Sequence, residues 1–237
     1  MKKQNSKYKK SVLFLLIYFP LHLSSEAHAV SLIASVPNAQ TTPKGVFMIA
    51  HESQVPYFPD PGKANWQTFN FFTYGISEQF EVASTVYNLT FPGSGRLAAS
   101  IGYKWVAPLS EQLKFIFGQE FPFALQGNVS VGHWTFTGLS YNFYQTNTRL
   151  TAGINSGSSL IFGSNVLDGF FGFEQSIVPH WTLIADWYSG KHDLGVLITA
   201  IQWNPNHSLT VITGPKWGNP GSFNENGWML EITYEFM

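Results

Sequence analysis

The chain ends in a stretch that decides its fold: Asn226-Gly227-Trp228-Met229-Leu230-Glu231-Ile232-Thr233-Tyr234-Glu235-Phe236. From Trp228 onward the residues alternate with a period of two, which predicts a β-strand because successive strand side chains point to opposite faces. One face is apolar, with aromatic rings at both ends and aliphatic side chains between them. The other face carries carboxylates, which could not point into lipid. This arrangement is typical of a strand that crosses a bilayer.

The same stretch resembles the closing strand of bacterial outer-membrane β-barrels, which usually ends in an aromatic residue. Phe236 takes that place and is followed by one further residue, Met237. The resemblance implies recognition by the barrel-insertion machinery through the apolar face, which is formed by Trp228, Leu230, Ile232, Tyr234 and Phe236. The alternative is the last strand of a soluble sandwich, so the rest of the chain has to decide.

The N-terminus has the pattern of a secretory signal peptide. Five Lys residues precede the apolar run Val12–Phe19, which is too short to span a bilayer, and Ala27-His28-Ala29 matches the A-x-A cleavage pattern. We therefore expect a cleavable signal peptide at residues 1–29, a periplasmic lead segment at 30–44 and a barrel at 45–237. This predicts export to the bacterial outer membrane.

The composition agrees with a membrane barrel. Aromatic residues make up 16% of the chain and charged residues only 11%, against roughly 25% charged residues in an ordinary soluble domain. Removing the five Lys and one Glu of the signal peptide leaves a net charge of about −5, which argues against a nucleic-acid partner. The chain has no Cys and therefore no disulfides. No segment after the signal peptide approaches 18 consecutive apolar residues, so we expect no transmembrane helix.

Twelve stretches have the character of strands, and the connections between them alternate between long and short. Outer-membrane barrels have an even number of strands, short periplasmic turns and longer external loops. We predict an all-β fold, a single transmembrane antiparallel up-and-down β-barrel in which the first strand pairs with the last. The predicted strands lie near residues 45–52, 65–74, 78–88, 95–106, 111–121, 133–143, 148–155, 168–177, 180–189, 193–203, 207–214 and 226–236.

Two short turns carry a family resemblance. The stretch Tyr74-Gly75-Ile76-Ser77-Glu78-Gln79-Phe80-Glu81-Val82 is similar to a turn of small porin-like proteins, the putative MetA-pathway-of-phenol-degradation family. Gly172–Ser176, followed by Val178–Leu183, is similar to the same kind of turn. The resemblance implies transport of hydrophobic solutes.

Alternation on the clearer strands predicts which charged side chains face the lumen, because an Arg or Lys facing lipid at the midplane would cost about 2–4 kcal/mol. Counting along the hairpins places Arg149 opposite Glu174, and makes Glu81 and Lys104 diagonal neighbours. Strands near 45–52, 133–143 and 193–203 are apolar on both faces and are left unassigned. The predicted lumen charges are Glu81, Lys104, Lys114, Glu120, Arg149, Glu174, Asp186, Glu231 and Glu235.

These charges predict a porin-like channel that passes small solutes passively and has outer-membrane lipid as its surroundings. Glu120, Asp186 and Glu231 fall in the middle and outer half, with Arg96 alone at the outer rim. This distribution favours cations or neutral solutes. The alternative is a closed structural or adhesive barrel without a pore.

A third class, a lipid-modifying hydrolase, finds less support. His51, His133, His180, His192 and His207 are each isolated in the sequence, and His51-Glu52-Ser53 lacks a nucleophile elbow. We therefore predict no enzyme. The absence of Cys, of H-x-x-x-H and of an Asp-rich loop predicts no cofactor and no metal site.

Overall fold

A computed structural model describes residues 32, 34–58, 66–89, 96–128, 130–192, 194–222 and 224–236. The predicted signal peptide, residues 1–29, and the final Met237 lie outside the described residues. Among the described residues, no helix is long and apolar enough to cross a membrane.

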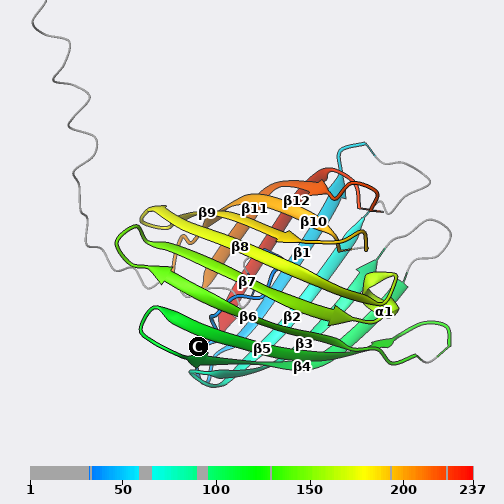
Figure 1. Ribbon diagram of the computed structural model, residues 1–237, viewed down its shortest axis with the longest axis horizontal. Helices are drawn as coiled ribbons and strands as arrows, with labels where there is room; N and C mark the ends of the chain where they lie inside the picture. Colours follow the sequence, from blue (N-terminus) through cyan, green and yellow to red (C-terminus); the bar gives the residue numbers. More distant parts are fainter. Residues whose placement is uncertain are drawn as a thin grey trace, which may run out of the picture.

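The twelve predicted strands are confirmed, and they close into an antiparallel barrel in which each strand pairs with its sequence neighbours (Figure 1). β1 pairs with β12 from Phe47↔Phe236 to Pro56↔Gly227, so the sheet has no open edge. The strands are β1 Phe47–Pro56, β2 Gln67–Ser77, β3 Phe80–Leu89, β4 Arg96–Pro108, β5 Leu113–Ala124, β6 Trp134–Phe143, β7 Thr148–Gly157, β8 Val166–Val178, β9 Trp181–Tyr188, β10 Val196–Trp203, β11 Leu209–Gly218 and β12 Gly227–Phe236.

Several strands reach further than their sequence patterns suggested. β11 was expected to end at residue 214, before Pro215, but it continues to Gly218 and pairs Pro215 with Trp228 of β12. A proline removes only its own N–H from the ladder of hydrogen bonds, and β12 still provides a pairing residue, Gly227, beyond Pro215. The extension places Lys216 inside the barrel.

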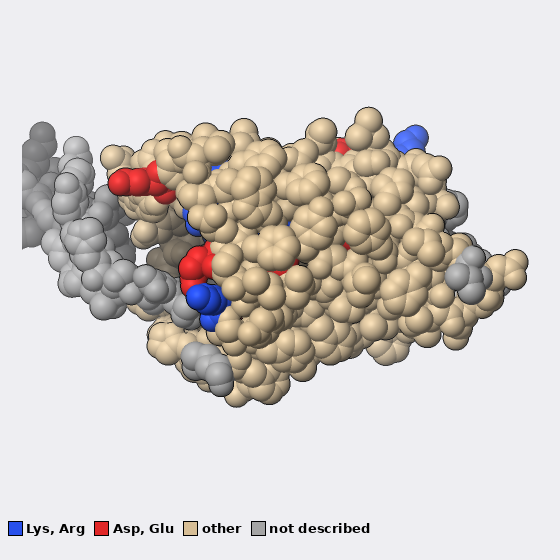
Figure 2. Space-filling view, turned by 90° about the horizontal axis from the view of Figure 1, so that it is seen from below, with Lys and Arg blue, Asp and Glu red and all other residues tan. Residues whose placement is uncertain are grey.

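The outward face of the barrel is apolar. Trp228, Leu230, Ile232, Tyr234 and Phe236 are each 40–48% exposed, while the alternate residues of β12 are buried. The face shown in Figure 2 is mostly uncharged; most of its Lys, Arg, Asp and Glu side chains lie toward one end, with a few toward the other. An uncharged surface of this kind suits contact with lipid chains.

The connections between the strands are arranged as predicted: short turns lie at one end of the barrel and longer loops lie at the other. The β7–β8 loop, at the end that we assign to the outside, contains the short helix α1 Ser159–Phe162. Ile161 and Phe162 are fully buried, and the Phe162 ring lies 6.0 Å from that of Trp134 and 5.0 Å from that of His192. This loop therefore packs into the outer mouth of the barrel.

The residues before β1 lie inside the lumen. Ala34, Val36 and Ala39 are 0%, 0% and 2% exposed and belong to the buried core. The chain reaches β1 by crossing Gly75 at the end of β2, where a Cβ atom would lie 2.1 Å from the carbonyl oxygen of Pro43. Only glycine allows this close approach. We call residues 34–42 the plug segment.

Candidate channel lumen

The nine charged residues identified in the sequence all occupy inward-facing positions of their strands. Glu81, Lys104, Glu174, Asp186, Glu231 and Glu235 are buried, while Lys114, Glu120 and Arg149 are partly buried. The side chain of Arg96, expected at the outer rim, lies outside the described part of the chain.

Two pairs of lumen charges test the predicted register. Arg149 lies opposite Glu174 and donates hydrogen bonds to both of its carboxylate oxygens, as predicted. The prediction that Glu81 and Lys104 are diagonal neighbours is wrong: they lie directly opposite, with Lys104 Nζ 3.2 Å from Glu81 Oε1. The β3–β4 ladder ends at Leu89↔Arg96, one residue later on each strand than the assumed pair at residues 88 and 95, which brings the charges into the same row.

Asp186 holds the tip of the plug segment. Its Oδ2 accepts hydrogen bonds from three consecutive backbone N–H groups, those of Ala34 at 2.8 Å, Ser35 at 2.7 Å and Val36 at 3.1 Å. Successive N–H groups that converge on one anion form a backbone nest. The carboxylate therefore fixes the turn of the plug segment at mid-height in the lumen.

Two further lumen charges hold the other end of this segment. The backbone N–H of Thr42 donates to Glu81 Oε2 at 2.6 Å, and Arg149 Nη2 donates to Gln40 Oε1 at 2.6 Å. The Thr42 hydroxyl also hydrogen-bonds to that of Thr73 on β2. Asp186, Glu81 and Arg149 thus anchor a segment whose position the sequence pattern did not reveal.

The middle of the lumen is acidic. Glu52 on β1 lies directly opposite Glu231 on β12, and both are buried. Among the described atoms, Glu231 Oε2 and Asp186 Oδ1 are buried without a hydrogen-bond partner. Lys216 is the basic group that interacts with Glu52, and its Nζ donates to Gln54 Oε1 at 3.1 Å.

Sequence reasoning missed Glu52 and Lys216. β1 is apolar at most positions on both faces, so its inward face was not assigned, although the predicted pairing of β1 with β12 could have placed Glu52 beside Glu231. Lys216 was missed because the strand was ended before Pro215.

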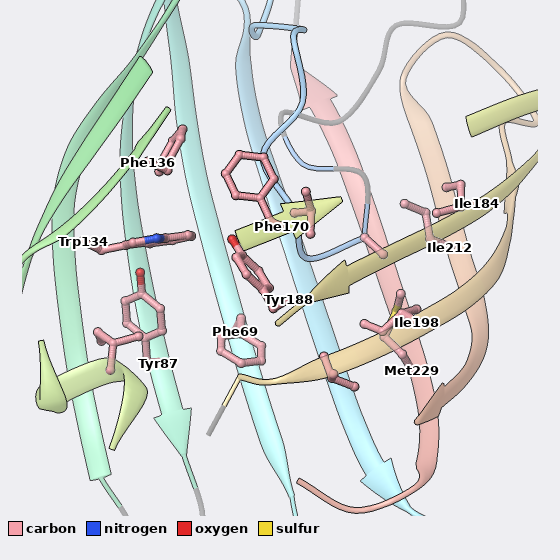
Figure 3. Close-up of a cluster of buried hydrophobic side chains, with 14 of the residues drawn as sticks. Phe69, Tyr87, Trp134, Phe136, Phe170, Ile184, Tyr188, Ile198, Ile212 and Met229 are labelled. Atoms are coloured by element: carbon pink, nitrogen blue, oxygen red, sulfur yellow. The ribbon is translucent and has the colours of Figure 1, made fainter. Parts of the chain in front are cut away.

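Aromatic side chains fill much of the space beside the plug segment. Figure 3 shows rings from several strands pointing into the barrel interior, with Trp134, Tyr87 and Tyr188 near one another. Trp134 packs 5.4 Å from Phe136 and 6.5 Å from Tyr188. Phe170 fits because β7 has Gly153 beneath it, where a Cβ would lie 2.3 Å from the ring. The lumen is therefore narrow at this level.

Toward the periplasmic end the lumen opens into a polar cavity of about 250 Å³. Gln40 of the plug segment forms one side, and Arg149 and Glu174 are on its wall. Two smaller spaces, of about 40 and 30 Å³, flank Leu32 further inside. The plug segment and the aromatic rings thus separate the periplasmic cavity from the outer mouth.

The histidines are not all isolated, contrary to the sequence prediction. His51 Nε2 lies 3.0 Å from Ser53 Oγ, and His51 Nδ1 lies 2.8 Å from Asn70 Oδ1, on the outward face of the barrel. Residues 51 and 53 share a face because they are two apart in a strand. The described residues include no group of three His, Cys, Asp or Glu side chains that could hold a metal ion.

No family model matches the chain, and the search of curated proteins finds no match either. A solved KdgM porin aligns with a TM-score of 0.58 and 8% identity over 81% of this chain and 99% of the porin. The chain has the fold of an outer-membrane β-barrel. A KdgM porin in complex with disordered oligogalacturonate gives a TM-score of 0.57 at 8% identity, with the same coverage.

At 8% identity these likenesses establish the barrel fold alone. Outer membrane phospholipase A from Escherichia coli aligns at a TM-score of 0.46 and 6% identity over 84% of this chain and 99% of the phospholipase, which is too distant to support an argument. The resemblance to the putative MetA-pathway family stays a prediction.

Proposed function

We propose that the protein is an outer-membrane channel for small solutes and that its plug segment closes the lumen. The observation that carries this proposal is the way the segment is held. Its hydrogen bonds to Asp186, Glu81 and Arg149 are made to side chains, while the β1–β12 ladder is complete without it. The segment can therefore leave the lumen without opening the barrel.

The acidic middle of the lumen supports a preference for cations or small neutral solutes. Glu52, Asp186 and Glu231 are all buried inside low-dielectric walls, and Lys216 interacts with Glu52. Once the plug segment has left and water fills the lumen, these carboxylates ionise, and a stretch of negative charge in such walls concentrates cations and repels anions. Hydrophobic solutes, which the family resemblance implies, would gain nothing from these carboxylates.

Conductance of the refolded mature protein in a planar bilayer tests the channel. We compare the wild type with a variant that lacks residues 30–42 and with Asp186→Ala, using Glu111→Gln in the exposed β4–β5 turn as a matched loss of one acidic charge. The deletion should conduct steadily, Asp186→Ala should open more often than the wild type, and Glu111→Gln should behave as the wild type does. A folded deletion variant that never conducts would contradict the proposal.

Selectivity is measured in the deletion background, because Asp186 also holds the plug segment. The reversal potential under a potassium chloride gradient should indicate cation preference and should move toward zero in Glu52→Gln and Glu231→Gln. Anion preference in the parent deletion would overturn the cation proposal and leave the channel proposal standing.

The aromatic layer favours a second candidate, a closed structural barrel. Trp134, Phe136 and Tyr188 pack against one another beside the plug segment, and they would still narrow the lumen after that segment has left. A folded deletion variant without conductance would support this candidate.

A further inference from the structure

We propose that Ser53, His51 and Asn70 form an acyl-ester hydrolase site on the lipid-facing surface of the barrel, an activity separate from the channel. β1 turns His51 and Ser53 outward while Glu52 between them is buried in the lumen. Asn70 lies directly opposite His51 on β2. Two paired strands thus bring a hydroxyl, an imidazole and a carboxamide together on the outward face.

The hydrogen bonds run in the order that nucleophilic catalysis requires. Asn70 Oδ1 can only accept, so His51 donates Nδ1–H to it at 2.8 Å. The other nitrogen, Nε2, is then free to accept the Ser53 Oγ–H at 3.0 Å. A nucleophile beside a base that is oriented by a third group is the arrangement by which serine hydrolases are recognised, whatever their fold.

Mutual hydrogen bonding would also satisfy three polar side chains that face lipid, where no water is available. That explanation requires only that each group has a partner. It does not require the imidazole to lie between a pure acceptor and a hydroxyl, and it offers no reason to place His and Ser together on a mostly apolar outward face.

The height of the site indicates its substrate. Ser53 lies three residues before Pro56, the outer end of β1, which is about 10 Å along a strand. Tyr57 and Trp66 follow and precede the same loop, and Trp228 faces lipid opposite Val55. Such aromatic rings mark the membrane interface, so Ser53 lies just below it in the outer leaflet, within reach of the ester groups of membrane lipids. The substrate class is therefore the fatty acyl ester of a membrane lipid.

Donors for an oxyanion are available in the next row of side chains. Thr68 lies opposite Ser53, and Asn88 of β3 lies opposite Thr68 on the same outward face. Opposite residues have Cβ atoms about 4.5–5.5 Å apart. The Thr68 hydroxyl and the Asn88 amide can therefore reach a carbonyl oxygen bound at Ser53.

The reaction balances with water as its only other reactant. Ser53 Oγ bonds to the ester carbonyl carbon as its proton passes to His51 Nε2. The carbon–oxygen bond to the alcohol breaks, and that proton goes to the departing oxygen. Water then attacks the acyl-serine, gives one proton to His51, and releases the fatty acid while the proton returns to Ser53 Oγ.

Two measurements on the refolded full-length mature protein test this site. The first is release of fatty acid from mixed micelles of phosphatidylethanolamine and from lipopolysaccharide, which separates the two sources of acyl ester. The second is covalent labelling by a fluorophosphonate probe, located by mass spectrometry. We expect hydrolysis of at least one lipid and a label on Ser53.

Variants separate catalysis from folding, which is monitored by the heat-dependent gel mobility of the barrel. Ser53→Ala and His51→Asn should each lower hydrolysis by about a thousandfold or more and abolish labelling. Asn70→Ala should lower it by at least about tenfold, and Asn70→Asp should restore part of the loss. Ser84→Ala, which removes an outward serine of β3 that bonds to a backbone carbonyl, should have no effect.

The inference is overturned if the folded wild type neither hydrolyses either lipid nor reacts with the probe. It is equally overturned if Ser53→Ala retains the wild-type rate. Neither result affects the channel proposal, because Ser53, His51 and Asn70 face away from the lumen.

Discussion

His192 lies in the β9–β10 loop, with its ring 5.0 Å from that of Phe162 and 6.3 Å from that of Tyr188. Burial lowers the pKa of His192, and this outweighs the opposing effect of Asp168, whose Oδ2 is 3.6 Å from Nε2. His192 Nδ1 also accepts a hydrogen bond from the Leu194 N–H, which protonation of Nδ1 would remove. The packed loop therefore holds the neutral form of the ring.

This pKa shift predicts an acid-sensitive outer loop. Because the unfolded chain binds the proton more readily than the folded loop does, stability contributed by His192 is complete above about pH 6.5 and is lost as the pH falls below that value. Thermal unfolding of the barrel at pH 7.5 and pH 5.5 should show a larger acid-induced loss in the wild type than in His192→Gln. Equal losses would contradict this role.

A second residue-scale prediction concerns Arg149 and Glu174, whose side chains are 14% and 10% exposed. Removing one partner leaves the other charge poorly solvated, so Arg149→Met and Glu174→Leu should each lower the free energy of unfolding by about 2 kcal/mol or more. The double variant Arg149→Met with Glu174→Leu should recover most of that loss. Urea unfolding of all four proteins, as a double-mutant cycle, measures the coupling, and a coupling near zero would contradict the prediction.

For single residues, the sequence predicted which face of a strand a charged side chain occupies better than it predicted which residue that side chain contacts. The period of two identified the inward face that holds Asp186, and the hairpin count paired Arg149 with Glu174. The hairpin count placed Glu81 diagonal to Lys104 instead of opposite it. The β3–β4 ladder ends one residue later on each strand than was assumed, and this changes which residues face each other. The count could not show that Asp186 binds Ala34, since these residues are far apart in sequence and no strand ladder joins them.

Among the elements, β12 makes the clearest prediction. Ile232 faces lipid near the middle of the strand, opposite His51 of β1. Ile232→Lys should lower the free energy of unfolding by about 2–4 kcal/mol, because lipid cannot solvate the ammonium group. Gln79→Lys in the exposed β2–β3 turn is the control and should be near neutral. Equal effects of the two variants, measured by refolding into lipid vesicles, would show that this face of β12 does not contact lipid.

The elements themselves divide into those that the sequence could predict and those that it could not. The twelve strands were predictable because lipid and lumen impose alternation on most of them, and because short turns and longer loops alternate between them. The plug segment and α1 have no such constraint. They are short, lack a periodic pattern, and are positioned by contacts such as Phe162 with Trp134, which depend on the closed barrel. The sequence likewise could not predict the close approach at Gly75, because that approach depends on where the fold positions Pro43.

For the whole molecule, the fold separates two environments that suit two activities. The lumen has an acidic middle, a layer of apolar and aromatic side chains, and the plug segment. The outward face is apolar except for a few side chains, among which Ser53, His51 and Asn70 are hydrogen-bonded in a row. A barrel with its lumen closed could still act on lipids at its outer surface, so the channel and the hydrolase are tested independently.

We propose that residues 34–42 close the lumen and that the aromatic rings beside them leave a conducting path. The most direct measurement is the single-channel conductance of the folded variant that lacks residues 30–42, recorded beside the wild type in the same planar bilayer. We expect steady conductance for the deletion and a predominantly closed state for the wild type. A deletion variant that is folded yet silent, or a wild type that conducts equally well, would contradict this proposal.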